Sequence, residues 1–239
     1  MLPDWRKSPF KDLPMFHSLT PLIQHGTLRV ALNLGNHALV QMIGDVPHGM
    51  APALASQLAQ ILGVPMRPVF YEGAGKVFQD ASRDQWDVGF LAIDSQRAKQ
   101  ISYTRPYHRI EVTYAVRKGG PVTDVAMADR AGLSVLTAVG SAYDMYLAAH
   151  LKHAIHDRLG TPAESFAAFS QGRGDVVAGV RASLVQYFKN DPLVTILSGV
   201  VTTVDQAMVL PGPQNPLIGA LDAFVAEALI DGLLAPYPG

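Results

Sequence analysis

The chain contains no cysteine among its 239 residues, so disulfide bonds and thiolate metal sites are excluded. Charge is also scarce, because only 16% of residues are charged and the formal net charge is -1. That balance predicts no general attraction to nucleic acid or to an anionic membrane. No stretch approaches the roughly 18 consecutive apolar residues of a membrane-spanning helix, so we expect no membrane insertion. Binding chemistry must therefore come from a local group of residues.

Apolar residues, in contrast, are abundant. They make up 49% of the chain, which is typical of a folded globular protein with room for one large domain or two small ones. Residues 1–25 are the exception. Prolines recur there, and the apolar residues follow neither a helical nor a strand period, so we expect an irregular arm. Charges and prolines also stand where a secretory leader would have its apolar core. Either a leader has been removed or is not in the sequence, or the protein stays in the cytoplasm.

Strand-like and helix-like segments alternate along the rest of the chain. The first series predicts a strand at 26–34, a helix at 50–64 with Leu54 and Leu58 on its apolar face, a strand at 66–72, a short helix at 76–84 and a strand at 86–93. The second predicts strands at 133–139, 175–180, 193–198 and 205–210, and helices at 141–159, 164–172, 181–190 and 215–234. This alternation predicts an α/β fold with parallel sheets covered by helices.

Two such series, each small for a domain, predict two lobes. We expect lobe 1 to comprise residues 26–111 and 207–239, and lobe 2 to comprise residues 112–206. Two strand segments, 110–114 and 203–208, would cross between the lobes and act as a hinge. The cleft beside such a hinge is a common site for small ligands.

Several short motifs, in their order and spacing, carry a family resemblance. They are "HGTLRVAL", "GMAPALASQLAQILGV", "DQWDVGFLAIDSQRAKQISYTRPY", "RKGGPV", "VLTAVGSAYDMYL" and "AAFSQGRGDVVAGV". From about Gln24 to Leu233 the chain resembles the amino-acid-type periplasmic solute-binding proteins of ABC transporters, which have the type 2 periplasmic-binding fold. The resemblance implies two lobes that close on a small solute, a periplasmic location, an ABC permease as partner, and no cofactor.

The same resemblance implies which residues hold a ligand. Arg97 takes the place of the arginine that clamps an α-carboxylate, and Ser141, between Gly140 and Ala142, takes the place of a serine that helps from the second lobe. A guanidinium matches a carboxylate with parallel donors. A helix starting near Ser141 would add free N–H groups and a positive dipole end. A solvated helix residue and a simple helix cap are the plain alternatives for Arg97 and Ser141.

Departures from the family pattern affect the predicted ligand. The position that receives an ammonium group falls on Val180, followed by Arg181, and positions that line the first lobe fall on Asn33, Asn36 and His37. An unpaired buried ammonium is costly, so we expect an organic acid or an atypical amino acid instead. Its body would lie against Phe90, Leu91 and Ala92, and Arg181, if it faces the cleft, would favour a second acidic group.

Two other functions stay open. Cyclohexadienyl dehydratases share this fold and need a proton donor, for which Glu72, Glu111 or His37 would serve. A soluble sensor without a transporter is the other alternative. His150, His153 and His156 fit a solvated helix face better than a zinc site, so we expect no metal. We expect a monomer, with a dimer as the alternative because the final helix stops early at two prolines.

Overall fold

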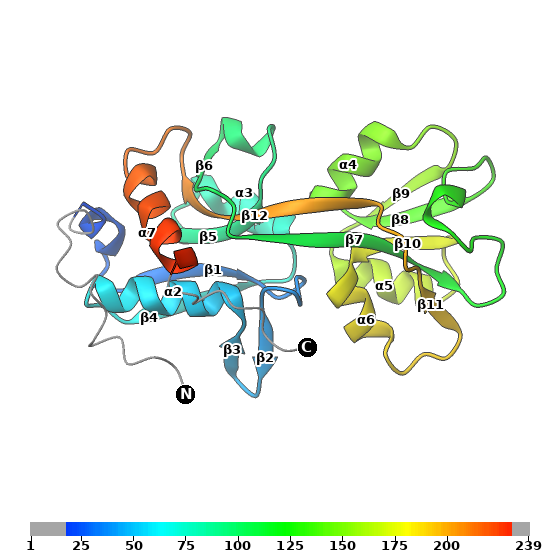
Figure 1. Ribbon diagram of the computed structural model, residues 1–239, viewed down its shortest axis with the longest axis horizontal. Helices are drawn as coiled ribbons and strands as arrows, with labels where there is room; N and C mark the ends of the chain where they lie inside the picture. Colours follow the sequence, from blue (N-terminus) through cyan, green and yellow to red (C-terminus); the bar gives the residue numbers. More distant parts are fainter. Residues whose placement is uncertain (1–17, 231–239) are drawn as a thin grey trace.

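The computed structural model describes residues 18–230 and shows two α/β lobes joined by two long strands (Figure 1). These strands are β7 (His108–Arg117) and β12 (Thr202–Pro211). A single sheet runs through both lobes in the order β4-β1-β5-β12-β7-β10-β8-β9, with β6 added to β12 and β11 added to β7. The predicted two-lobed architecture with two crossover strands is therefore confirmed.

Lobe 1 is built on three parallel strands. The strands are β1 (Leu28–Asn33), β4 (Met66–Tyr71) and β5 (Val88–Ala92), followed by the short β6 (Ile101–Tyr103). Its helices are α2 (Met50–Ile61), α3 (Ala74–Gln79) and α7 (Ile218–Ile230), with 3-10 turns η3 (Thr20–Ile23), η4 (Asp80–Ser82) and η5 (Arg97–Lys99). A hairpin of β2 (Gln41–Ile43) and β3 (Val46–His48) projects from it.

Lobe 2 repeats the same plan. Its strands are β8 (Ser134–Ala138), β9 (Ile155–Leu159), β10 (Val176–Val180) and β11 (Val194–Ile196). Its helices are α4 (Ala142–His150), α5 (Pro162–Ser170) and α6 (Arg181–Phe188), and the turn η6 (Val125–Met127) precedes β8. No helix in the part of the chain that the structure describes is both long and apolar enough to cross a bilayer.

Each lobe has a hydrophobic core on both faces of its sheet. In lobe 1, Phe90 packs among residues of α2 and α7, while its neighbour Leu91 packs on the opposite face with Trp86 and Val77. Alternate residues of a strand point to opposite faces, so a strand covered on both sides is apolar throughout. Phe90 and Leu91 are therefore core residues, and their burial leaves little side-chain surface for the predicted contact with a ligand.

Several predicted elements are confirmed with small shifts. Helix α2 buries Leu54 and Leu58 as expected and stops before Gly63, whose φ of 70° suits a helix terminus. The predicted arm lies mostly outside the described residues. Its last part forms η3, and Leu19 and Leu22 are buried in the core of lobe 1. The end of the final predicted helix, beyond Ile230, also lies outside the described residues.

The helix predicted over residues 141–159 is wrong in its second half. It ends at His150, and residues 155–159 form β9 beside β8 instead. The Asp129 carboxylate accepts hydrogen bonds from the backbone N–H groups of Lys152, His153 and Ala154. These bonds hold three consecutive N–H groups that a continuing helix would have bonded internally, so the chain turns there.

Candidate functional site

The two lobes meet where the carboxyl ends of β1, β4 and β5 face the loops that follow β8 and β10. Gly35 and Gly75 of lobe 1 come so close to lobe 2 that a Cβ on Gly35 would lie 2.9 Å from Pro162 Cγ, and one on Gly75 would lie 2.7 Å from the Val139 carbonyl oxygen. We call this line of contact the interlobe seam. Ligands of open α/β sheets bind at this edge of the strands.

Arg97 lies in the seam and is buried, with 2% of its surface exposed. Its guanidinium donates to the Ala92 carbonyl oxygen of its own lobe at 3.3 Å and to the Gly140 carbonyl oxygen of lobe 2 at 2.5 Å. Its Nε is buried and has no hydrogen-bond partner. Among residues 18–230 no carboxylate forms an ion pair with it. The Asp94 carboxylate accepts from the backbone N–H groups of Gln96 and Arg97 and not from the guanidinium. Burial lowers the pKa of this guanidinium, because removal from water disfavours its charged form.

Gly140, Ser141 and Ala142 form the start of α4 opposite Arg97. Gly140 has a φ of 71°, a left-handed conformation that favours glycine. Ser141 is the helix cap, and its Oγ accepts from the Asp144 backbone N–H at 3.1 Å. Ala142 is the first helical residue.

Internal groups occupy part of the helix N-terminus at Ser141, where we expected free N–H groups for an anion. Asp144, with none of its surface exposed, accepts from the Gly140 N–H at 2.9 Å, from Thr137 Oγ1 at 2.7 Å and from Arg158 Nε at 2.8 Å. Burial alone would raise the pKa of Asp144, but the bonds from Arg158, Thr137 and Gly140 outweigh it and lower the pKa. The Asp144 carboxylate therefore takes one of the backbone donors next to the start of α4, the Gly140 N–H.

The loop after β1 brings Asn33, Asn36 and His37 to the seam. Asn33 Oδ1 accepts from the Gly35 N–H at 3.0 Å, and the Asn36 Oδ1 is buried with no partner. The His37 N–H donates to Ser183 Oγ of lobe 2 at 3.1 Å, and Ser183 Oγ donates back to the Gly35 carbonyl oxygen at 2.9 Å. His37 Nδ1 is buried without a partner, and burial lowers the pKa of the ring. The imidazole is therefore neutral at pH 7.

Arg181, which we expected to favour a second acidic group if it faces the cleft, already has partners within the protein. Its Nε donates to Glu111 at 2.7 Å, and its other nitrogens donate to the carbonyl oxygens of Leu197, Ser198 and Gly199. Glu111 lies in β7, so the pair ties α6 to the crossover region. The neighbouring Val180 is a buried strand end, and Ala92 contributes its carbonyl oxygen to Arg97 and to the Tyr103 hydroxyl.

The two carboxylates considered as proton donors both have cationic partners. Glu72 accepts from Lys76 at 2.6 Å, and this bond lowers the pKa of Glu72. Glu111 is paired with Arg181. A general acid needs a raised pKa near the working pH, and the bond from Lys76 shifts the pKa of Glu72 in the opposite direction.

A pocket of about 420 Å³ lies between the lobes beside His37. Its lining comes from both lobes: Leu34, Gly35, His37 and Glu72 from lobe 1, and Pro162, Ala163, Phe166, Ser183, Gln186 and Tyr187 from lobe 2. Sequence reasoning missed the lobe 2 residues. Nothing in the spacing of Phe166 and Tyr187 separates them from other aromatic residues, because their meeting depends on how α5 and α6 pack.

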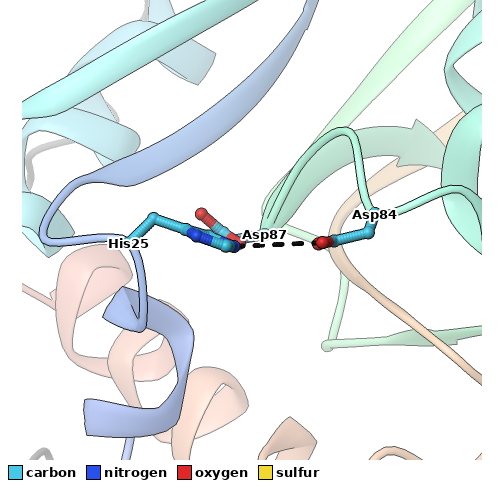
Figure 2. A group of neighbouring side chains, drawn as sticks. All are labelled: His25, Asp84 and Asp87. Atoms are coloured by element: carbon cyan, nitrogen blue, oxygen red, sulfur yellow. Dashed lines mark ion pairs between the residues drawn. The ribbon is translucent and has the colours of Figure 1, made fainter.

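Two groups of possible metal ligands have other partners. Figure 2 shows His25, Asp84 and Asp87 close together, and their ligand atoms lie within 4.8 Å of one another. Arg29 donates to both carboxylates, at 2.5 Å to Asp84 and 2.7 Å to Asp87, so we assign a salt-bridge network. His150, His153 and His156 do not share the helix face that we expected. His150 lies in α4 near the Tyr146 carbonyl, and His156 lies in β9 near Thr137.

Comparisons with solved structures agree with this architecture. The arginine-binding protein ArgBP of T. maritima, in its P235GK mutant, matches with a TM-score of 0.76 at 19% identity, over 90% of this chain and 94% of that one. A solute receptor for L-cysteine of Neisseria gonorrhoeae matches with a TM-score of 0.77 at 19% identity, over 90% and 89%. An ancestral amino-acid-binding protein, AncCDT-1, described as a precursor of cyclohexadienyl dehydratase, matches with a TM-score of 0.73 at 18% identity, over 91% and 96%. These likenesses establish the fold.

Membership of a family comes from the sequence itself. No curated protein matches the chain. The family model of bacterial extracellular solute-binding proteins, family 3, matches residues 28–235, which covers both lobes and the seam between them. The chain therefore belongs to family 3 of the bacterial extracellular solute-binding proteins and is a two-lobed ligand-binding receptor.

Proposed function

We propose that this receptor captures a small carboxylate-bearing molecule between its lobes and delivers it to an ABC-type importer. The supporting observation is the buried Arg97 guanidinium, which has only neutral oxygen partners among the described residues and an unpaired Nε. A buried cation without an anion is costly, and a carboxylate would relieve that cost with bidentate, charge-assisted bonds. In this proposal the acid replaces the Gly140 carbonyl as the partner of Arg97.

An organic acid fits the seam better than an ordinary zwitterionic amino acid. An ammonium group needs a carboxylate or several acceptors when it is buried. The position where we expected such a group is Val180, and the two nearby carboxylates, Glu72 and Glu111, are paired with Lys76 and Arg181. The proposed ligand therefore has a negative group and an uncharged body.

A thermal-shift screen against small organic acids and amino acids tests the proposal. A ligand that binds only the folded state raises the melting temperature. We expect organic acids to stabilise the protein and their amides or methyl esters to have no effect. Arg97→Ala should weaken binding of the best acid by about 2–5 kcal/mol.

The matched control is Arg67→Ala, because Arg67 is an exposed arginine of β4 in the same lobe. Calorimetric titration with the best acid should give the same affinity for this variant as for the unmodified protein. Equal binding by the Arg97→Ala variant would contradict the proposed role of Arg97. The importer role predicts that disruption of the gene lowers uptake of the same acid by the source cell.

A further inference from the structure

The pocket beside His37 has an aromatic wall that belongs entirely to lobe 2. The rings of Phe166 in α5 and Tyr187 in α6 meet edge to face, with centroids 5.3 Å apart and planes at 65°. Phe166 is buried and packs further against Phe188, while Tyr187 is 44% exposed. Tyr187 therefore presents aromatic surface that the protein itself leaves uncovered.

The charges around the pocket are balanced. Glu72 is the one ionised lining residue of the described chain, and Lys76 neutralises it at 2.6 Å. His37 is neutral because burial lowers its pKa. No lysine or arginine lines the pocket within residues 18–230. The lining thus offers neither a cation for an anion nor a free carboxylate for an ammonium, and it suits an uncharged group.

His37 and Ser183 lie on one side of the pocket. The Ser183 Oγ is already bonded to Gly35 and His37, and the His37 Nδ1 is buried from solvent. The free surface of the pocket is therefore mainly apolar.

We propose that this pocket holds an aromatic ring of the ligand, packed against Phe166 and Tyr187. This inference deepens the proposed function and rests on it, because the ring belongs to the acid whose carboxylate binds Arg97. The pocket and Arg97 lie along the same stretch of the interlobe seam. A Cβ on Gly73 would lie 3.4 Å from Pro162 of the pocket wall, and two residues later Gly75 contacts Gly140, the partner of Arg97. The ligand class is therefore an aryl-substituted carboxylic acid.

The lack of cysteine allows a direct test. Gln186 is an exposed residue of the pocket lining, so Gln186→Cys places one thiol at the pocket. The variant is equilibrated with a phenyl-bearing disulfide and an alkyl disulfide of equal length, and intact mass spectrometry measures the extent of capture. We expect the phenyl group to be captured about three- to tenfold more, the range expected for an added aromatic contact.

Gln171→Cys is the matched control, because Gln171 is an exposed glutamine at the end of α5 outside the pocket. For this variant the ratio of phenyl to alkyl capture should be about one, because position 171 lies outside the pocket and its aromatic wall. Adding Tyr187→Leu to Gln186→Cys should bring the ratio down to the control value. A ratio at position 186 no larger than at 171, or one unchanged by Tyr187→Leu, would overturn the aromatic pocket.

A competition experiment tests the link to Arg97. Free 3-phenylpropanoate should reduce phenyl capture in the Gln186→Cys protein and lose this effect when Arg97→Ala is added. If 3-phenylpropanoate reduces phenyl capture equally with and without Arg97→Ala, or in neither protein, the proposed link between the pocket and Arg97 is overturned. The capture ratio itself does not depend on a carboxylate. If no acid binds in the thermal-shift screen but the ratio of phenyl to alkyl capture is retained, the proposed function is refuted. If acids bind but the capture ratio is lost, the aromatic pocket is refuted.

Discussion

At the scale of single residues, Arg97 is the feature that connects the sequence to a binding function. It is a buried cation held by the carbonyl oxygens of Ala92 and Gly140, one from each lobe. Neutral oxygen atoms compensate a buried charge less well than a carboxylate does. In the proposed function, a bound carboxylate would therefore contact a side chain that is bonded to both lobes.

The shape of the guanidinium, as well as its charge, should matter for binding. Arg97→Lys keeps the positive charge but loses the planar pair of donors that matches a carboxylate. We expect the affinity for the best acid of the thermal-shift screen to fall at least tenfold, or about 1.4 kcal/mol. Isothermal titration calorimetry measures this directly. Full retention of affinity by the lysine variant would mean that Arg97 acts as a point charge only.

Asp144 should govern part of the acid sensitivity of lobe 2. Its folded pKa is lowered, so its contribution to the free energy of unfolding is complete above the ordinary value of 3.8 and is lost as pH falls through the lowered folded pKa. Asp144→Asn should destabilise the protein at pH 7 by about 1–3 kcal/mol, because Arg158 loses a charged partner. The difference from the unmodified protein should shrink below pH 3.8.

Denaturant unfolding at several pH values checks this dependence. Asp157→Asn is the control, since Asp157 pairs with the exposed Arg173, and such surface pairs contribute about 0–1 kcal/mol. An Asp144→Asn penalty that stays constant down to pH 2 would contradict the assignment.

The sequence predicts some of these residues better than others. The family pattern predicts Arg97 and Ser141 as site residues, and both lie where the lobes meet, because each comes shortly after a strand whose end is set by the hydrophobic pattern. Arg181 also follows a strand end, but its partners are Glu111 and the carbonyl oxygens of residues 197–199. Those partners come from distant parts of the chain, and local pattern contains no information about them.

At the scale of elements, the largest error concerns the helix after Ser141. Local pattern favours continuation through residue 159, and the helix stops at His150 because Asp129, more than twenty residues earlier, takes the next free N–H groups. Strand β5 shows a related limit. A fully apolar strand predicts burial on both faces, but it does not tell which of its residues border a ligand, and here only its end at Ala92 reaches Arg97.

The turn that begins α3 should control closure of the lobes. A Cβ on Gly75 would lie 2.7 Å from the Val139 carbonyl oxygen of lobe 2, yet within lobe 1 the backbone of Gly75 is helical and accepts alanine. Gly75→Ala should therefore hold the lobes apart and weaken ligand binding about tenfold or more, while the melting temperature without ligand changes little.

Gly219→Ala provides the control for that variant. Gly219 lies in α7 and has no atom within 4 Å of an added Cβ. Calorimetric affinities and melting temperatures of the two variants are compared side by side. If Gly75→Ala binds ligand as well as Gly219→Ala does, the contact between Gly75 and lobe 2 is not needed in the bound state.

At the scale of the whole molecule, two strands connect the lobes and pair with each other over a short ladder. Thr202–Gln206 of β12 pair with His108–Val112 of β7, and beyond this ladder each strand continues in a different lobe (Figure 1). We propose residues 26–111 with 207–239 and residues 112–206 as the two moving bodies. Arg109–Asp205 and Arg181–Glu111 add ion pairs at this hinge.

Hinge closure predicts a measurable change in overall size. Small-angle scattering should give a smaller radius of gyration at saturating acid than without ligand, because bending about two strands brings the lobes together. Gly75→Ala should keep the larger value under both conditions. Identical scattering of the unmodified protein with and without a ligand that binds in calorimetry would indicate a cleft of fixed width.

The paired crossover strands also have a topological consequence. The chain leaves for lobe 2 along β7 and comes back along its hydrogen-bonded neighbour β12, so lobe 2 is an insertion whose two ends stand side by side. A module of different specificity could replace that insertion while β4, β1 and β5 keep their order. Replacing lobe 2 would therefore require chain junctions at only one place, the paired strands β7 and β12.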